Sequence, residues 1–160
     1  MKHAGVMKTW ILRLRLYWLA AWLYETYRLL LKPHTHGALV ALWCQERVLL
    51  VQTSYRHELS LPGGGVKRGE MANLAASREL LEELGLELQS MQLGEPWVVT
   101  EHSERGRNTV SIYTLNMAEE PEIEVDGLEI IDFHWLIPQQ ALARNLTTHL
   151  RRYLVDYPVS

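Results

Sequence analysis

Hydrophobic positions along this chain of 160 residues fall into short runs that polar or glycine-rich segments separate. The first two runs after residue 33 are 37–44 (GALVALWC) and 48–52 (VLLVQ), with the polar residues 45–47 between them. Short apolar, β-branched runs that end at polar segments are typical of β-strands. This pattern predicts a hairpin or two neighbouring strands.

A glycine-rich segment and a helical pattern come next. Residues 57–70 (HELSLPGGGVKRGE) contain one proline and four glycines, which favour a loop. Residues 71–84 contain mostly strong helix formers, and Gly85 then provides a typical C-terminal cap. We therefore predict a loop followed by a helix.

Helical spacing divides this helix into two faces. One face carries four leucines, which are Leu74, Leu80, Leu81 and Leu84. The opposite face carries three alanines and three glutamates, which are Ala72, Ala75, Ala76, Glu79, Glu82 and Glu83. We predict that the leucine face packs into a core and that the other face stays acidic.

The remaining strand and helix patterns lie in the second half of the chain. Three further runs have strand composition, at 97–100, 109–117 and 130–136, with a polar loop at 101–108 and an acidic one at 118–128. Pro138 suits the first turn of a last helix, and the apolar residues of 146–154 recur at helical spacing.

Residues 1–33 form a segment of different character. Strong helix formers that stop at Pro33 predict an amphipathic helix, followed by one globular domain over 34–160. The longest uncharged run, 16–24, is too short to span a bilayer, which takes about 20 apolar residues. The aromatic and basic residues of the whole segment 1–33 suit a membrane surface, but a polar stripe along the predicted helix leaves a broad apolar face that could pack on protein. We favour packing on the domain or a homodimer over membrane contact.

Composition limits the classes of function. The single cysteine, Cys44, has no metal-ligand spacing around it, which argues against disulfides and structural zinc and favours a reducing, cytoplasmic location. The net charge of -3 divides into +5 for residues 1–33 (six basic residues and Glu25) and therefore -8 for the rest. An acidic body is a poor general binder of nucleic acids.

The three glutamates of the helix are the strongest candidate for chemistry. Carboxylates at positions i, i+3 and i+4 repel one another, so a bound cation would relieve their repulsion. Hard oxygen ligands of this kind suit Mg²⁺ or Mn²⁺. A solvated acidic face is the common alternative, and the triplet by itself does not decide between the two.

The segment around the triplet carries a longer pattern. Residues 64–86 read as a glycine, five residues, a glutamate, seven residues, Arg-Glu, an aliphatic residue, any residue, Glu-Glu, any residue, a glycine and an aliphatic residue. This stretch resembles the signature of the Nudix hydrolases without a gap or a mismatch, and a weaker resemblance covers about residues 37–155. It implies a Nudix fold, which is an α/β/α sandwich around a mixed β-sheet.

The resemblance also implies an activity and roles for individual residues. The expected reaction is divalent-metal-dependent hydrolysis of the P–O–P bond in a nucleoside diphosphate linked to another group, such as a nucleotide sugar. Glu79, Glu82, Glu83 and the carbonyl oxygen of Gly63 would ligate Mg²⁺ or Mn²⁺. An ion pair of Glu70 with Arg78 would hold the loop, and Gly64 and Gly85 would support the site.

Residues outside the pattern complete the set of candidates. An additional acidic ligand or general base is expected from a later loop, with Glu129 preferred and Glu101 and Glu104 as competitors. Phosphate oxygens and the base or sugar would need further partners, for which the candidates are Arg68, Arg105, Arg107, Tyr55, His57 and Trp97. The more common role of such arginines is a solvated surface position, and that of Trp97 is a place in the packed core of a strand.

Two other functions fit the same residues. A nucleotide-binding sensor would keep the fold without turnover, although a binder has no need of every catalytic carboxylate. A hydrolase of lipid-linked diphosphates at a membrane surface would give residues 1–33 a role. Which diphosphate is cleaved stays open.

Overall fold

The computed structural model describes residues 34–88, 93–103, 106–125, 127 and 129–157. The helix expected over residues 1–33 lies outside these ranges. The described residues divide into two compact units: the larger lies within 35–100 and 108–157, and the smaller contains residues 34, 101–103, 106 and 107. Within the described residues, no helix is long and apolar enough to cross a membrane.

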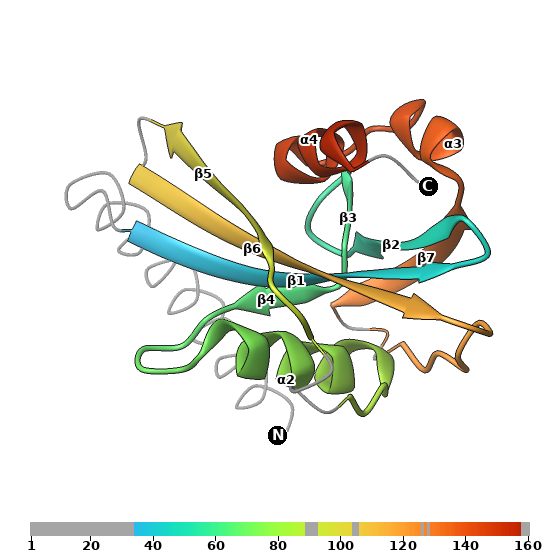
Figure 1. The fold of residues 1–160 in the computed structure, drawn as a ribbon, viewed down its shortest axis with the longest axis horizontal. Coiled ribbons are helices and arrows are strands. Elements are labelled where there is room, and N and C mark those ends of the chain that lie inside the picture. The colour runs from blue at the N-terminus through green and yellow to red at the C-terminus, as the bar shows by residue number, and fades with distance from the viewer. Residues whose placement is uncertain (1–33, 89–92, 104–105, 126, 128, 158–160) are drawn as a thin grey trace, which may run out of the picture. The chain divides into compact units, whose positions relative to one another are not determined.

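The larger unit is built on a β-sheet. The described part of the chain has seven strands, which are β1 (His34–Cys44), β2 (Arg47–Thr53), β3 (Leu59–Ser60), β4 (Gly63–Gly65), β5 (Trp97–Ser103), β6 (Gly106–Met117) and β7 (Ile130–Leu136). Their order is β3-β2-β1-β6-β5, with β4 paired to β1 and β7 paired to β2. The pairs of β1 with β2 and β4, and of β2 with β3 and β7, are antiparallel, whereas β1 and β6 run in the same direction, so the sheet is mixed (Figure 1).

The predicted hairpin is present as β1 and β2. Trp43 pairs with Val48, and the turn residues Gln45 and Glu46 have φ values of 49° and 65°. Two successive residues with positive φ make the tight turn whose twist matches that of the flanking strands. The polar spacing between the two apolar runs is therefore the turn itself.

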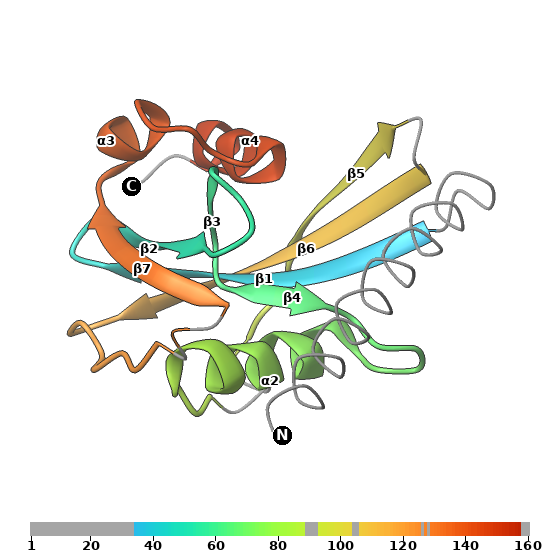
Figure 2. The ribbon, with the colours of Figure 1, turned by 180° about the vertical axis from the view of Figure 1, so that it is seen from behind.

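Side chains of β1 alternate between two cores on opposite faces of the sheet. One core lies against α3 (Pro138–Leu142) and α4 (Thr148–Asp156) and includes Leu39, Ala41, Trp43, Leu150 and Tyr153. The other core lies against α2 (Ala72–Leu84) and includes Ala38, Val40, Leu42, Ala76 and Leu80. Helices on both faces of a mixed sheet make an α/β/α sandwich, as predicted (Figures 1 and 2).

Two predicted boundaries differ from the structure. The polar loop expected at 101–108 is shorter, because β5 continues to Ser103 and β6 begins at Gly106. The last helix is two helices, because α3 ends at Leu142 and α4 begins only at Thr148. The intervening backbone bonds to β3 instead: the N–H of Leu59 donates to the carbonyl of Asn145 at 2.8 Å, and that of Thr147 donates to Leu59 at 3.1 Å.

The predicted faces of α2 were partly wrong. Leu74 and Leu81 are 47% and 51% exposed, whereas Ala75 and Ala76 are fully buried and Glu83 is only 5% exposed. Leu80 and Leu84 are buried as expected. Small alanines let the helix approach the sheet closely, so the buried face is centred near Ala76 and Glu83 and overlaps the acidic one. The acidic face therefore points partly into the protein.

Candidate active site

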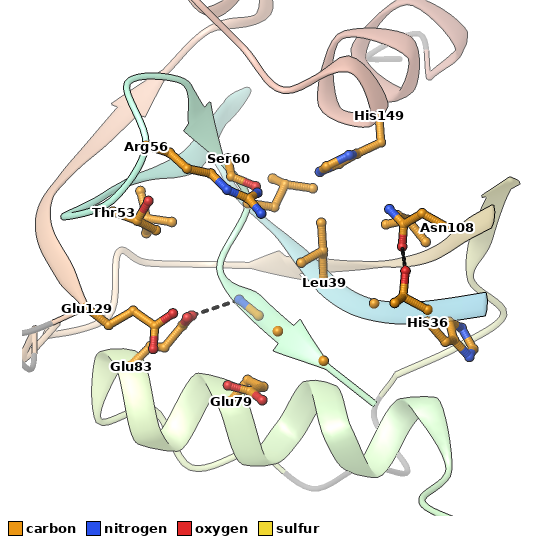
Figure 3. A pocket seen from close by; sticks show the side chains of 18 of the residues that line it. His36, Leu39, Thr53, Arg56, Ser60, Glu79, Glu83, Asn108, Glu129 and His149 are labelled. Carbon is orange, nitrogen blue, oxygen red and sulfur yellow. Dashed lines mark hydrogen bonds between the residues drawn. The ribbon is translucent and has the colours of Figure 1, made fainter. Parts of the chain in front are cut away.

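A cavity of about 360 Å³ lies within the larger unit, between α2, the sheet and α4 (Figure 3). Its charged and polar lining comes from segments far apart in the sequence. These lining residues are Thr35, His36, Thr53, Tyr55, Arg56, Ser60, Glu79, Glu83, Asn108, Glu129 and His149. Three carboxylates therefore face one cavity, two from α2 and one from the residue before β7.

Strand β4 fixes the carboxylates of α2. The backbone N–H of Gly63 donates to Oε2 of Glu83 at 2.8 Å. Gly63 has a φ of 125°, and a Cβ there would lie 2.3 Å from the carbonyl oxygen of Ala38, so only glycine fits. A Cβ at Gly64 would lie 2.7 Å from Cδ of Glu79. The two glycines thus leave room for strand pairing with β1 and for the carboxylate of Glu79.

Arg78 connects the loop before α2 with the acidic face. Its Nε donates to Oε1 of Glu70 at 2.9 Å and its Nη2 to Oε2 of the same carboxylate at 3.1 Å. The ion pair expected between these residues is therefore present. The hydrogen bond from Arg78, helped by the backbone N–H of Lys67, lowers the pKa of Glu70 from 4.5 to about 2. The same bond to Glu70 raises the pKa of Arg78.

The same guanidinium also reaches the metal-ligand candidates. Nη1 of Arg78 donates to Oε1 of Glu79 at 2.7 Å and to Oε2 of Glu82 at 3.0 Å. Its contacts offset the repulsion among the carboxylates of α2. The C-terminus of this helix is closed by Gly85, with a φ of 68° and an N–H that bonds back to Leu81 at 3.1 Å.

Glu129 reaches the cavity through the pairing of β2 with β7. Thr53 pairs with Ile130, and the carbonyl of Glu129 accepts from the N–H of Ser54 at 2.8 Å. The hydroxyl of Tyr55 donates to Oε1 of Glu129 at 2.7 Å. Burial, together with this hydrogen bond, raises the pKa of Tyr55 to about 12. The preferred later carboxylate and the tyrosine named as a substrate partner are therefore neighbours.

The other wall of the cavity has a different charge. Arg56 enters from the loop between β2 and β3, and His149 enters from α4 (Figure 3). Burial, with the nearby charge of Arg56, lowers the pKa of His149 to about 4, so the imidazole is neutral at pH 7. Nε2 of His149 lies 3.1 Å from Oγ1 of Thr147. The wall therefore presents one permanent positive charge.

Several sequence candidates do not line this cavity. The side chain of Glu82 is 55% exposed, and Arg68 and Arg107 are exposed side chains on a turn and on β6. Arg105 and Glu104 lie outside the described residues. Glu101 belongs to the smaller unit, where its Oε1 is buried without a hydrogen-bond partner among the described residues.

The sequence did not indicate the residues that line the cavity away from the carboxylates of α2. Arg56, Ser60, Asn108 and His149 line the cavity and belong to four different elements or loops. Only Arg56 carried a local signal, because it follows Tyr55 directly and precedes the glycine-rich loop by a few residues. The others come together only through tertiary packing.

The donor atoms of α2 fit a divalent cation. Glu79, Glu82 and Glu83 offer hard carboxylate oxygens from one helix face, and Glu83 is buried beside Gly63. Within the described residues, no three His, Cys, Asp or Glu side chains are gathered as a ready metal site. Arg78 donates hydrogen bonds to Glu79 and Glu82, and the Gly63 N–H donates to Glu83.

A model of the NUDIX domain family matches residues 33–157. The chain belongs to the Nudix family. It is a Nudix pyrophosphohydrolase, and enzymes of this family generally use divalent metals and act on small molecules. Among curated proteins, none matches the chain.

Solved structures of other Nudix proteins share this fold. A MutT NUDIX hydrolase from Burkholderia pseudomallei has 23% identity and a TM-score of 0.68, covering 79% of this chain and 99% of its own. The dihydroneopterin triphosphate pyrophosphohydrolase of E. coli has 25% identity and a TM-score of 0.64, covering 76% and 93%. A bifunctional NMN adenylyltransferase/ADP ribose pyrophosphatase from Francisella tularensis, complexed with AMP and a Mn ion, has 21% identity and a TM-score of 0.61, covering 92% and 46%.

Proposed function

We propose that this Nudix enzyme hydrolyses the P–O–P bond of a nucleoside diphosphate linked to a second group. One observation carries the proposal: Glu79 and Glu83 of α2 line the same cavity as Glu129, which directly precedes β7. The names of two structural neighbours, a pyrophosphohydrolase and a pyrophosphatase, support the same bond as the point of cleavage. Residues 34–160 would form the catalytic domain.

In this proposal the carboxylates of α2 hold the metal. Glu79, Glu82 and Glu83, with the carbonyl oxygen of Gly63, would bind Mg²⁺, and Mn²⁺ would substitute for it. When bound, such a cation neutralises phosphate charge and lowers the pKa of a coordinated water. The pair of Glu70 with Arg78 would hold the loop between β4 and α2 against the helix.

Glu129 is assigned as the general base. A water oxygen would form a bond to one phosphorus, the bridging P–O bond would break, and the proton of the water would pass to Glu129. The products would be a nucleoside monophosphate and a phosphate ester of the second group. The hydrogen bond from Tyr55 would fix the carboxylate of Glu129 in its position.

A substrate screen tests the proposal. Purified protein with Mg²⁺ or Mn²⁺ is incubated with nucleoside triphosphates, nucleotide sugars, ADP-ribose and dinucleotides, and monophosphate release is measured. We expect turnover of one class, with loss of at least about 100-fold in Glu83→Gln. Thermal unfolding of the variant checks that the fold is retained.

The screen also distinguishes the alternative function. A nucleotide sensor would give a thermal shift with one compound and no turnover of any. Turnover that survives Glu83→Gln unchanged would contradict the metal assignment.

A further inference from the structure

The charge of the cavity is divided between two ends. Glu79, Glu83 and Glu129 supply three carboxylates at one end, next to the glycines of β4 (Figure 3). Among the described residues that line the cavity, Arg56 is the one lysine or arginine. His149 adds no charge at pH 7, because its pKa is lowered to about 4. One guanidinium therefore supplies the positive potential of the opposite end.

The guanidinium of Arg56 has no carboxylate partner among the described residues. Arg78 is bound to three glutamates and Arg47 to Glu120, whereas Arg56 makes no such ion pair. Its Cζ lies 5.6 Å from the ring centroid of Tyr55, and its backbone carbonyl accepts a hydrogen bond from Gln52. The contact with the ring orients the side chain, and neither contact occupies its N–H donors, which stay available for a ligand.

A buried hydroxyl lies in the same lining. Thr53 is only 8% exposed, and its Oγ1 is buried with no hydrogen-bond partner in the part of the chain that the structure describes. The pairing of β2 with β7 shifts register between Gln52 and Thr53, and such bulges redirect side chains. A buried hydroxyl without a partner is costly, so a ligand that bonds to it regains that loss.

We infer that Arg56 and Thr53 form an anion subsite for the substrate phosphate that the carboxylates of α2 and their metal do not hold. The inference rests on the proposed function. A guanidinium presents two parallel N–H donors that match the oxygens of a phosphate, and a threonine hydroxyl donates a further hydrogen bond. The subsite fixes the diphosphate along the line from Arg56 to α2. Arg56 thereby takes the role that the sequence suggested for Arg68, Arg105 and Arg107.

Binding of inorganic pyrophosphate in the presence of Mg²⁺ tests the subsite directly. Isothermal titration is carried out on the full chain, on Arg56→Gln and Arg56→Lys, and on Thr53→Val. We expect the dissociation constant to rise about tenfold or more in Arg56→Gln, less in Arg56→Lys, and at least about threefold in Thr53→Val. Arg152→Gln, an exposed arginine on α4 outside the cavity, controls for loss of one positive charge and should bind as the wild type does.

Steady-state kinetics on the substrate found in the screen give a second readout. Arg56→Gln should raise KM about tenfold and change kcat by less than about threefold, because the phosphate contact exists before and during the reaction. Equal binding of pyrophosphate by Arg56→Gln and the wild type, an equal loss in Arg152→Gln, or no binding by the wild type would overturn the subsite. Unfolding midpoints identify any variant whose loss of binding reflects misfolding. If Arg56→Gln is such a variant, the affinity of Arg56→Lys for pyrophosphate decides whether the subsite exists.

The two proposals fail in different ways. Pyrophosphate binding that depends on Arg56, with no turnover of any substrate, would refute hydrolysis and keep the subsite. Turnover that needs Glu83 but is indifferent to Arg56 would refute the subsite and keep the hydrolase.

Discussion

A Cβ atom at Gly64 would lie 2.7 Å from Cδ of Glu79, a separation that real side chains do not tolerate. Because Gly64 has no side chain, the carboxylate of Glu79 can lie against the backbone of β4. Because the obstructing atoms are the far end of a flexible side chain, a substitution at Gly64 would move Glu79 and leave the backbone in place.

Gly64→Ala should therefore impair activity more than stability. We expect hydrolysis to fall about 100-fold, since misplacing a reacting group by about 1 Å has this effect, while the free energy of unfolding changes by less than about 1 kcal/mol. Gly65→Ala is the matched control, because a Cβ there meets no atom within 4 Å. Equal activity of the two variants would show that Glu79 can act from a displaced position.

Glu82→Gln should lower metal-dependent hydrolysis with little effect on the fold. Its side chain is 55% exposed and bonds Arg78, which keeps its other carboxylate partners in the variant. Loss of a ligand should reduce the rate at least about 100-fold and raise the Mg²⁺ concentration needed for half-maximal rate. An unchanged Mg²⁺ dependence would remove Glu82 from the ligand set.

Glu70→Gln should lower stability in a pH-dependent way. The folded pKa of about 2 lies below the ordinary value of 4.5, so the stabilisation from this carboxylate is complete above pH 4.5 and is lost as the pH falls from 4.5 toward 2. The difference in unfolding free energy between wild type and variant should therefore shrink over that range. Urea unfolding at pH 7, 4.5 and 3 measures it, with the exposed Glu87→Gln as control.

Tyr55→Phe tests the role given to Glu129. Removing the hydroxyl deletes the 2.7 Å hydrogen bond to Oε1 of Glu129 while keeping the aromatic ring. We expect kcat to fall about tenfold in Tyr55→Phe and about 100-fold or more in Glu129→Gln. A Glu129→Gln enzyme with wild-type kcat would exclude Glu129 as the general base and leave Glu101 as a candidate for that role.

His149→Gln should reduce the loss of folding stability that the wild type shows as the pH falls from 7 to 4. The folded pKa of about 4 is below the unfolded value of 6.5, so the unfolded chain takes up the proton first as the pH falls. Wild-type stability should decrease by roughly 3 kcal/mol between pH 7 and pH 4 on this account. The variant should lose less, whereas the exposed His57→Gln should behave as the wild type.

Interactions between residues close in the sequence determined several local features of this protein. The turn of the β1–β2 hairpin, the C-terminal cap at Gly85 and the three carboxylates on one helix face depend on residues a few positions apart. The pattern over 64–86 therefore identifies the Nudix family without any information on tertiary contacts. Even the pair of Glu70 with Arg78 spans only eight positions.

Tertiary structure decided which face of α2 is buried and what faces its carboxylates. The leucine periodicity predicted burial of Leu74 and Leu81, but the alanines allowed a closer approach to the sheet, and both leucines are exposed. Glu129 meets Tyr55 across 74 positions through the register of β2 with β7, and His149 faces Arg56 because α4 folds back over the sheet. These contacts depend on the pairing and packing of segments that are distant in the sequence, which no local pattern encodes.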